Sequence, residues 1–266
     1  MAGILRSLFG RPAPLPIPDA ADWRGALGLP LFVGLPDTDR AALKALAEEL
    51  LASRTFTPVS GAAPTGLDLA AIAAQAALPV LRLGAGWYGT WNEVILYPEQ
   101  FVPEREITDD FGIVHRVRQP LSGEAWEGGP LILSLDDVAA SGWRDGYNVV
   151  IHEFAHKLDM KNGAVDGLPP LHGDMDPLAW AAAFGPAYDD FCRRADAFDA
   201  GGPEPLIDPY AAESPAEFFA VLSEYFFELP HLLAAEYPAV HGQLARFYRQ
   251  DPLSRLEPTS HDPATS

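Results

Sequence analysis

The sequence predicts a single α+β domain in which a β-sheet packs against helices. Short runs rich in Val, Ile and Leu, separated by Gly and Pro, occur between about residues 79 and 138, a pattern typical of strands and turns. Segments with helical spacing of apolar residues precede and follow this region. We find no internal repeat and no linker, so the order of helices, strands and helices indicates one domain.

The N-terminal part predicts two helices after a leader. Residues 1–18 are proline-rich, and we expect a weakly ordered leader. A helix is expected over residues 36–54, with Asp37 as its N-cap and leucines at helical spacing on one face. An alanine-rich second helix is expected to begin near Leu67.

The remaining elements follow the same two patterns. Four strands are expected, at residues 79–83, 93–97, 112–119 and 129–135. Helices are expected over residues 149–161, 176–198, 214–229 and 241–250. After Pro252 the chain is rich in Ser, Thr and Pro, so we predict a compact domain over residues 19–252 and a disordered tail over 253–266.

Charge and cysteine content restrict the classes of function. The 37 acidic residues against 18 basic ones give a net charge of −19, which argues against direct binding of nucleic acid. Cys192 is the single cysteine, so no intramolecular disulfide can form and a reducing compartment is favoured. We see no signal-peptide core and no stretch of ~20 uncharged apolar residues, and therefore expect a cytoplasmic protein without membrane contact.

The sequence HEFAH at residues 152–156 predicts a metal site. On a helix, His152 and His156 lie on one face one turn apart, so both imidazoles can bind one ion. Glu153 sits about 100° around the helix, where its carboxylate can reach a water at the metal without binding the ion itself. The alternative is a chance motif on an exposed face, but the flanking residues are apolar, which favours a metal site.

A catalytic zinc site needs a third protein ligand. The HExxHxxGxxH arrangement is excluded, because Asp159 and Asn162 stand where it requires glycine and histidine. Carboxylates in or beside a later apolar segment are the alternative source, and the candidates are Asp208, Glu213, Glu217, Glu224 and Glu228. Glu217 also completes a capping box with Ser214, and the pattern leaves both roles open.

Four long motifs carry a resemblance to a known family. IHEFAHKLD, DPYAAESPAEFFAVLSEYFF, GWYGTWNEVILYPEQFV and FYRQDPL together resemble the Mlc titration factor A family of bacterial zinc peptidases. The likeness extends from about residue 25 to residue 255. It implies a zincin-like domain, a cytoplasmic location, and peptidase activity of the aminopeptidase type. It also implies binding to Mlc, a glucose-system transcriptional repressor.

The resemblance also implies roles for individual residues. His152, His156 and Glu217 correspond to the ligands of one Zn²⁺ per chain, and Glu153 corresponds to the general base. The family is similar to the catalytic domain of anthrax lethal factor, in which a tyrosine seven residues before the glutamate ligand faces the substrate. Tyr210 has this spacing, and we expect it to stabilise the oxyanion.

These features favour a zinc-dependent peptidase that acts on peptides and also binds a Mlc-like repressor. The alternative is a repressor-titrating binding protein whose zinc site is vestigial or regulatory. We expect Glu213 and Glu224 to lie outside the ligand set, and Asp159 to orient a ligand, cap the helix end or pair with a lysine.

Two further expectations concern the surroundings of the site. The strand Leu131–Leu135 is expected to be a sheet edge that lines the cleft and pairs with an extended substrate. The other histidines lack metal-ligand spacing, so we assign no metal role to His115, His172, His231, His241 or His261.

Overall fold

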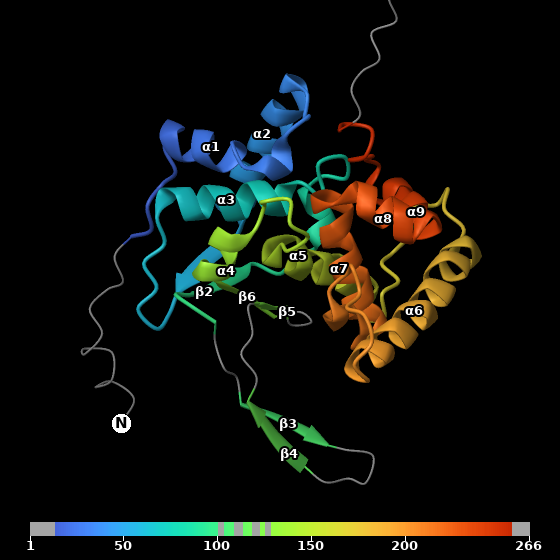
Figure 1. Ribbon diagram of the computed structural model, residues 1–266. Coiled ribbons are helices and arrows are strands. Elements are labelled where there is room, and N and C mark those ends of the chain that lie inside the picture. Colours follow the sequence, from blue (N-terminus) through green and yellow to red (C-terminus); the bar gives the residue numbers. More distant parts are fainter. Residues whose placement is uncertain (1–13, 101–103, 109–113, 119–122, 126–128, 257–266) are drawn as a thin grey trace, which may run out of the picture.

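The computed structural model describes residues 14–100, 104–108, 114–118, 123–125 and 129–256, with the backbone alone for 104–108 and 114–118 (Figure 1). It confirms the α+β class. Most of the expected leader and most of the expected tail, residues 1–13 and 257–266, lie outside the described residues. Leu15, which belongs to the expected leader, packs against the hydrophobic core. The boundaries of leader, domain and tail stay predictions.

Helices form most of the described chain. The α-helices are α1 Ala20–Leu27, α2 Asp37–Ser53, α3 Gly66–Ala77, α4 Leu135–Ala140, α5 Val149–Asp159, α6 Pro177–Asp199, α7 Pro215–Glu228, α8 Pro230–Glu236 and α9 Pro238–Tyr248. Short 3₁₀ helices are η2 Pro30–Phe32, η3 Ala85–Tyr88, η4 Met160–Asn162 and η5 Pro209–Ala212. The expected helices over residues 36–54, 149–161, 176–198 and 214–229 match α2, α5, α6 and α7 closely, and the last expected helix begins earlier, as α9.

The starts of helices α2 and α3 differ in detail from the sequence prediction. Asp37 is the first residue of α2, preceded by Pro36, and no side chain caps this helix, so the prediction of Asp37 as N-cap was wrong. Helix α3 begins at Gly66, where Thr65 and Asp68 form a complete capping box. Pro36, directly before α2, has no backbone N–H, so its position at the helix start costs no hydrogen bond within the helix.

The strands form one mixed sheet and one hairpin. The strands are β1 Thr55–Pro58, β2 Glu93–Tyr97, β3 Glu104–Thr108, β4 Val114–Arg118, β5 Gly123–Ala125 and β6 Leu131–Ser134. In the order β1-β2-β6-β5, the first three strands are parallel and β5 is antiparallel to β6. Strands β3 and β4 pair separately with each other.

Two strand predictions were wrong. Residues 79–83 form turns, in which Val80 O accepts from Leu83 N and Gly84 N, so this short apolar run is not extended. Val80 is buried, whereas Leu81 and Leu83 are partly buried. Strand β6 is not an edge strand, because it pairs with β2 on one side and with β5 on the other. The described edge beside the helices is β5, which has only three residues and no alternating pattern.

The helices bury one continuous apolar core on the sheet. Helix α3 packs against α1 and α2 on one side and against α5 on the other, and α5 packs against α7 (Figure 1). Helix α5 also contacts β5 and β6, so it lies between the sheet and α7. In the described part of the chain, no helix combines the length and low polarity that crossing a membrane requires.

Candidate active site

The HExxH segment lies on α5, which is the central helix of the domain. All eleven residues of α5 are buried, from Val149 to Asp159. Asn148 precedes the helix and caps it, because its side-chain oxygen accepts from Ile151 N at 2.9 Å. A buried helix that carries two histidines, a glutamate, a lysine and an aspartate requires partners for these polar groups.

Three donor atoms converge beside α5. His152 Nε2 and His156 Nε2 are 3.2 Å apart, and Glu217 Oε2 lies 3.0 Å and 3.2 Å from them. Four-coordinate zinc with bonds of about 2.0–2.1 Å places its ligand atoms about 3.3 Å from one another. The triangle therefore has the size of three corners of a tetrahedral metal site, and a chemically suitable set of nitrogen and carboxylate donors.

The other nitrogen of His152 fixes its ring. Nδ1 lies 2.8 Å from Glu224 Oε1, and when Nδ1 carries the proton it donates to this carboxylate and leaves Nε2 available to an ion. Burial alone lowers the pKa of His152, but its hydrogen bonds with Glu217 and Glu224 leave the pKa well above its ordinary value. Glu217 and Glu224 thus stabilise a positive charge on the His152 ring.

Glu217 stands at the start of α7 with its side chain turned to the histidines. Ser214 caps the helix by accepting from Glu217 N at 3.1 Å, so only half of the expected capping box forms. Burial would raise the pKa of Glu217, but its hydrogen bonds with His152 and His156 hold the pKa well below the ordinary value. Glu217 is therefore ionised and can serve as an anionic ligand.

Glu153 is buried next to the edge strand β5. Its side chain is close to Gly123, where an added Cβ would lie 2.5 Å from Glu153 Oε1. Burial raises the pKa of Glu153 to about 7, partly offset by the nearby histidines, and Oε2 has no hydrogen-bond partner among the described residues. A carboxylate with a pKa near neutrality and a free oxygen can both take up and release a proton.

Tyr210 belongs to η5, just before the α7 helix. Its ring centroid lies 6.0 Å from that of His152, and 46% of the residue is exposed. Asp208 accepts from Tyr210 N at 2.9 Å and thereby holds the turn. Tyr210 thus lies near the ring of His152 and is partly exposed to solvent.

The remaining acidic candidates have distinct positions. Glu213 is exposed at the surface, whereas Glu228 is buried near the start of α5, where burial raises its pKa to about 7 and the charges of Asp145 and Glu224 add to the rise. Asp159 is fully buried and accepts from Gly167 N at 2.8 Å. Asp159 therefore ties the loop after α5 to the helix end, and within the described part of the chain it makes no hydrogen bond with a histidine.

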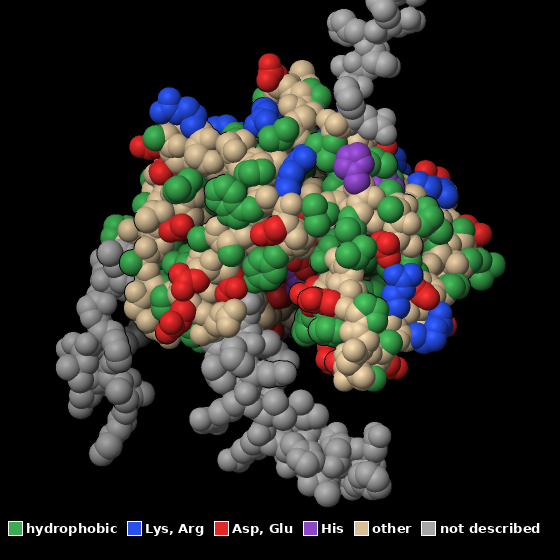
Figure 2. Space-filling model, viewed as in Figure 1, with side chains coloured by type: hydrophobic (Ala, Val, Ile, Leu, Met, Phe, Trp, Pro, Cys, Tyr) green, Lys and Arg blue, Asp and Glu red, His purple; other side chains and the backbone are tan. Residues whose placement is uncertain are grey.

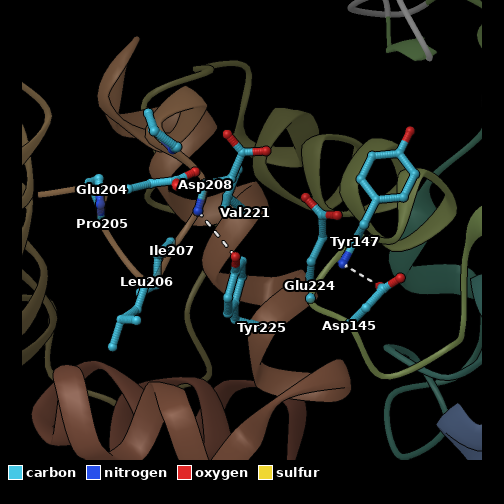
Figure 3. A pocket seen from close by; sticks show the side chains of 12 residues that line it. Asp145, Tyr147, Glu204, Pro205, Leu206, Ile207, Asp208, Val221, Glu224 and Tyr225 are labelled. Carbon is cyan, nitrogen blue, oxygen red and sulfur yellow. Dashed lines mark hydrogen bonds between the residues drawn. The ribbon is translucent and has the colours of Figure 1, made fainter. Parts of the chain in front are cut away.

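An acidic pocket of about 350 Å³ adjoins the site (Figure 3). Glu224 and Tyr225 from α7 line its centre, Asp208 lies on one side and Asp145 on the other. Glu224 lines this pocket and also pairs with His152, so one side chain lies between the pocket and the metal-ligand candidates. Figure 2 shows acidic side chains gathered around a hollow near the lower centre of the face that it presents.

Two features of the site were not predicted from the sequence. Gly123 is packed against Glu153, and nothing in the short segment around it signals a strand. Asn148 was not singled out, although an asparagine directly before an apolar helix is a recognisable N-cap signal. His172, to which the sequence assigns no metal role, has other partners: its Nε2 donates to Phe247 O, and its ring packs on Trp87.

Comparison with known proteins agrees with this geometry. A family model described as glucose-regulated metallo-peptidase M90 matches residues 13–249. Mlc titration factor A from Yersinia pestis (strain Pestoides F) is 42% identical over 238 residues, which cover 89% of this chain and 87% of the relative. Mlc titration factor A from Yersinia pseudotuberculosis serotype O:1b (strain IP 31758) gives the same values. The chain therefore belongs to the Mlc titration factor A family of metallopeptidases.

Proposed function

We propose that this protein is a zinc-dependent peptidase of the aminopeptidase type. The observation that carries the proposal is the triangle of His152 Nε2, His156 Nε2 and Glu217 Oε2, with Glu153 on the same helix. Nitrogen and carboxylate donors at these spacings suit zinc, and a set of three protein ligands leaves one position open. A cytoplasmic location is part of the proposal and rests on the family resemblance.

The proposed mechanism assigns a task to each side chain. When bound, zinc acts as a Lewis acid that polarises a carbonyl and makes water more acidic. Glu153 takes the proton of the attacking water and delivers it to the leaving amine, for which a pKa of about 7 is suited. Tyr210 stabilises the developing oxyanion, and Glu224 keeps the ring of His152 oriented.

We assign substrate alignment to β5. Because β6 lies inside the sheet, the edge beside α5 is β5, and its Gly123 is packed on Glu153. An extended peptide that adds to this edge would place its backbone beside the general base. The absence of a side chain at position 123 allows Glu153 to pack directly against this edge strand.

The acidic pocket supports a preference for a free amino terminus. Asp145, Glu204, Asp208 and Glu224 line it, and we attribute to these carboxylates the binding of the charged α-amine of a peptide. Acetylation of the amine removes the charge, so blocked peptides should be poorer substrates.

Binding of a Mlc-like repressor is the second function that we propose. The name of the relatives, Mlc titration factor A, favours it. The net charge of −19 suits a partner with a basic surface. The competing hypothesis is that the chain only titrates the repressor and that its metal site is vestigial or regulatory.

One set of measurements tests both hypotheses. The parent protein, Glu153→Gln and the surface control Glu213→Gln are analysed for metal content and for hydrolysis of free and N-acetylated peptides. We expect one zinc ion per chain in all three proteins and at least ~10²-fold slower hydrolysis for Glu153→Gln only. A parent protein that contains zinc but cleaves no peptide would favour the binding-only hypothesis.

A further inference from the structure

One fully buried side chain, Asn148, holds the start of the active helix. Its Oδ1 accepts from Ile151 N at 2.9 Å, and its backbone carbonyl accepts from His152 N at 3.0 Å. These bonds fix the first turn of α5, which carries His152 and is directly followed by Glu153.

The amide group of Asn148 makes two further bonds to other helices. Nδ2 donates to Gln75 Oε1 in α3 and to Glu228 Oε1 at the end of α7, both at 2.7 Å. The second oxygen of Glu228 accepts from Arg144 N at 2.6 Å, so Glu228 is itself fixed. Asn148 thus joins α3, α5 and α7 and uses every donor of its side chain.

A short chain of hydrogen bonds leads from Asn148 to the proposed metal ligands. The backbone N of Asn148 donates to Glu224 Oε2, and Glu224 Oε1 pairs with His152 Nδ1 at 2.8 Å. The carboxylate that orients the histidine ring is therefore itself held by Asn148. A shift of Asn148 moves both the helix turn that carries His152 and the acceptor that fixes its ring.

We propose that Asn148 is a positioning residue that sets the metal affinity of this site, an inference that rests on the proposed function. Asn148 touches none of the three converging donor atoms directly and acts through Glu224 and the first turn of α5. Residues that orient ligands from outside the coordination sphere typically change metal affinity or activity 10–100-fold when they are mutated.

A cap alone would not require asparagine. Serine caps helices about as well, but it lacks the two amide protons that Gln75 and Glu228 accept. Asn148→Ser therefore preserves the cap and removes the links to α3 and α7. A matched control is Asp176→Ser at the start of α6, where Asp176 is an exposed cap that accepts from Leu178 N.

The test compares zinc affinity and metal geometry in these variants. Zinc dissociation constants are measured by competition with a chromogenic chelator, and the absorption of the Co(II)-loaded proteins reports ligand geometry. We expect Asn148→Ser to bind zinc at least about 10-fold more weakly with an altered Co(II) spectrum, and Asp176→Ser to match the parent. Parental zinc affinity and a parental Co(II) spectrum in Asn148→Ser would overturn the proposal.

A second variant tests the proposal if Asn148→Ser does not fold. Gln75→Met preserves volume and removes one acceptor of the Asn148 amide, so we expect weaker zinc binding in the same direction. Parental affinity in Gln75→Met would then overturn the proposal. If the parent binds no zinc, or His156→Ala binds zinc as tightly as the parent, the proposed function fails and the role of Asn148 fails with it, whereas parental affinity in the Asn148 and Gln75 variants of a zinc-binding parent overturns the role of Asn148 alone.

Discussion

Gly123→Ala should impair catalysis without affecting metal binding. An added Cβ would lie 2.5 Å from Oε1, 2.6 Å from Cγ and 2.8 Å from Cδ of Glu153. Ordinary contacts between such atoms are roughly 3.5–4.0 Å, so the carboxylate must move by about 1 Å. A displacement of this size costs about 10²-fold in rate when it affects a group that must be aligned with the reacting atoms.

The assay separates the displaced base from general damage. We expect kcat of Gly123→Ala for a free peptide to fall about 100-fold, whereas the zinc content stays parental because the proposed ligands are not contacted. The control is Gly173→Ala, where an added Cβ meets nothing within 4 Å. It should leave both kcat and zinc content unchanged.

A parental kcat in Gly123→Ala would refute this reasoning. It would mean that Glu153 is not the base or that its carboxylate moves freely during catalysis. Loss of zinc together with activity would instead show that β5 supports the ligands, and would contradict the assignment of Gly123 to the base alone. Thermal unfolding of both variants checks that each protein is folded.

Three further predictions follow from individual glutamates. Glu217→Gln should weaken zinc binding and abolish most peptidase activity while unfolding stability stays near parental, because Ser214 still caps α7; normal zinc binding would contradict this. Glu153→Gln should retain binding to a Mlc-like repressor, with an association rate that falls as salt rises; a salt-independent rate would exclude electrostatic steering. Burial raises the pKa of Glu228 from 4.5 to about 7, so the folded chain keeps a proton that the unfolded chain has released, and the free energy of unfolding falls as pH rises across this window. Glu228→Gln, but not Glu213→Gln, should reduce that fall by up to about 3 kcal/mol in urea titrations, and an unchanged slope would show that Glu228 does not titrate there.

The helical part of the site could be predicted because its signals are local. The HExxH spacing and the apolar flanks of α5 both depend on a 3.6-residue period, which a sequence displays directly. The same holds for α7, where Ser214 and Pro215 indicate the helix start. The two histidines of the proposed metal site therefore follow from local patterns. For Glu217 the pattern left a capping role and a ligand role open, and only the family resemblance favoured the ligand role.

The sheet edge could not be predicted because its signals are not local. Strand β5 has three residues, and it becomes a strand by pairing with β6. Nothing in Gly123–Ala125 distinguishes it from a loop, so the sequence pattern predicts the more apolar run of β6 as the edge. Likewise, the burial of Glu228 depends on Asn148 and Arg144, which lie about eighty residues earlier in the chain.

The sequence pattern left open whether Glu217 or Glu224 is the third metal ligand, and the structure gives the two carboxylates different partners. Their spacing of seven residues is two helical turns, so both face α5 from α7, and both lie within hydrogen-bond distance of His152. They contact opposite nitrogens: Glu217 faces Nε2, which His156 also faces, whereas Glu224 accepts from Nδ1 and from Asn148 N. Because both oxygens of Glu224 accept hydrogen bonds, it can replace Glu217 as a ligand only by giving up its bond with His152 Nδ1 and by leaving the buried backbone N–H of Asn148 unpaired. Two carboxylates of the same helix are thus suited to different roles, one to hold an ion and one to orient the histidine that holds it.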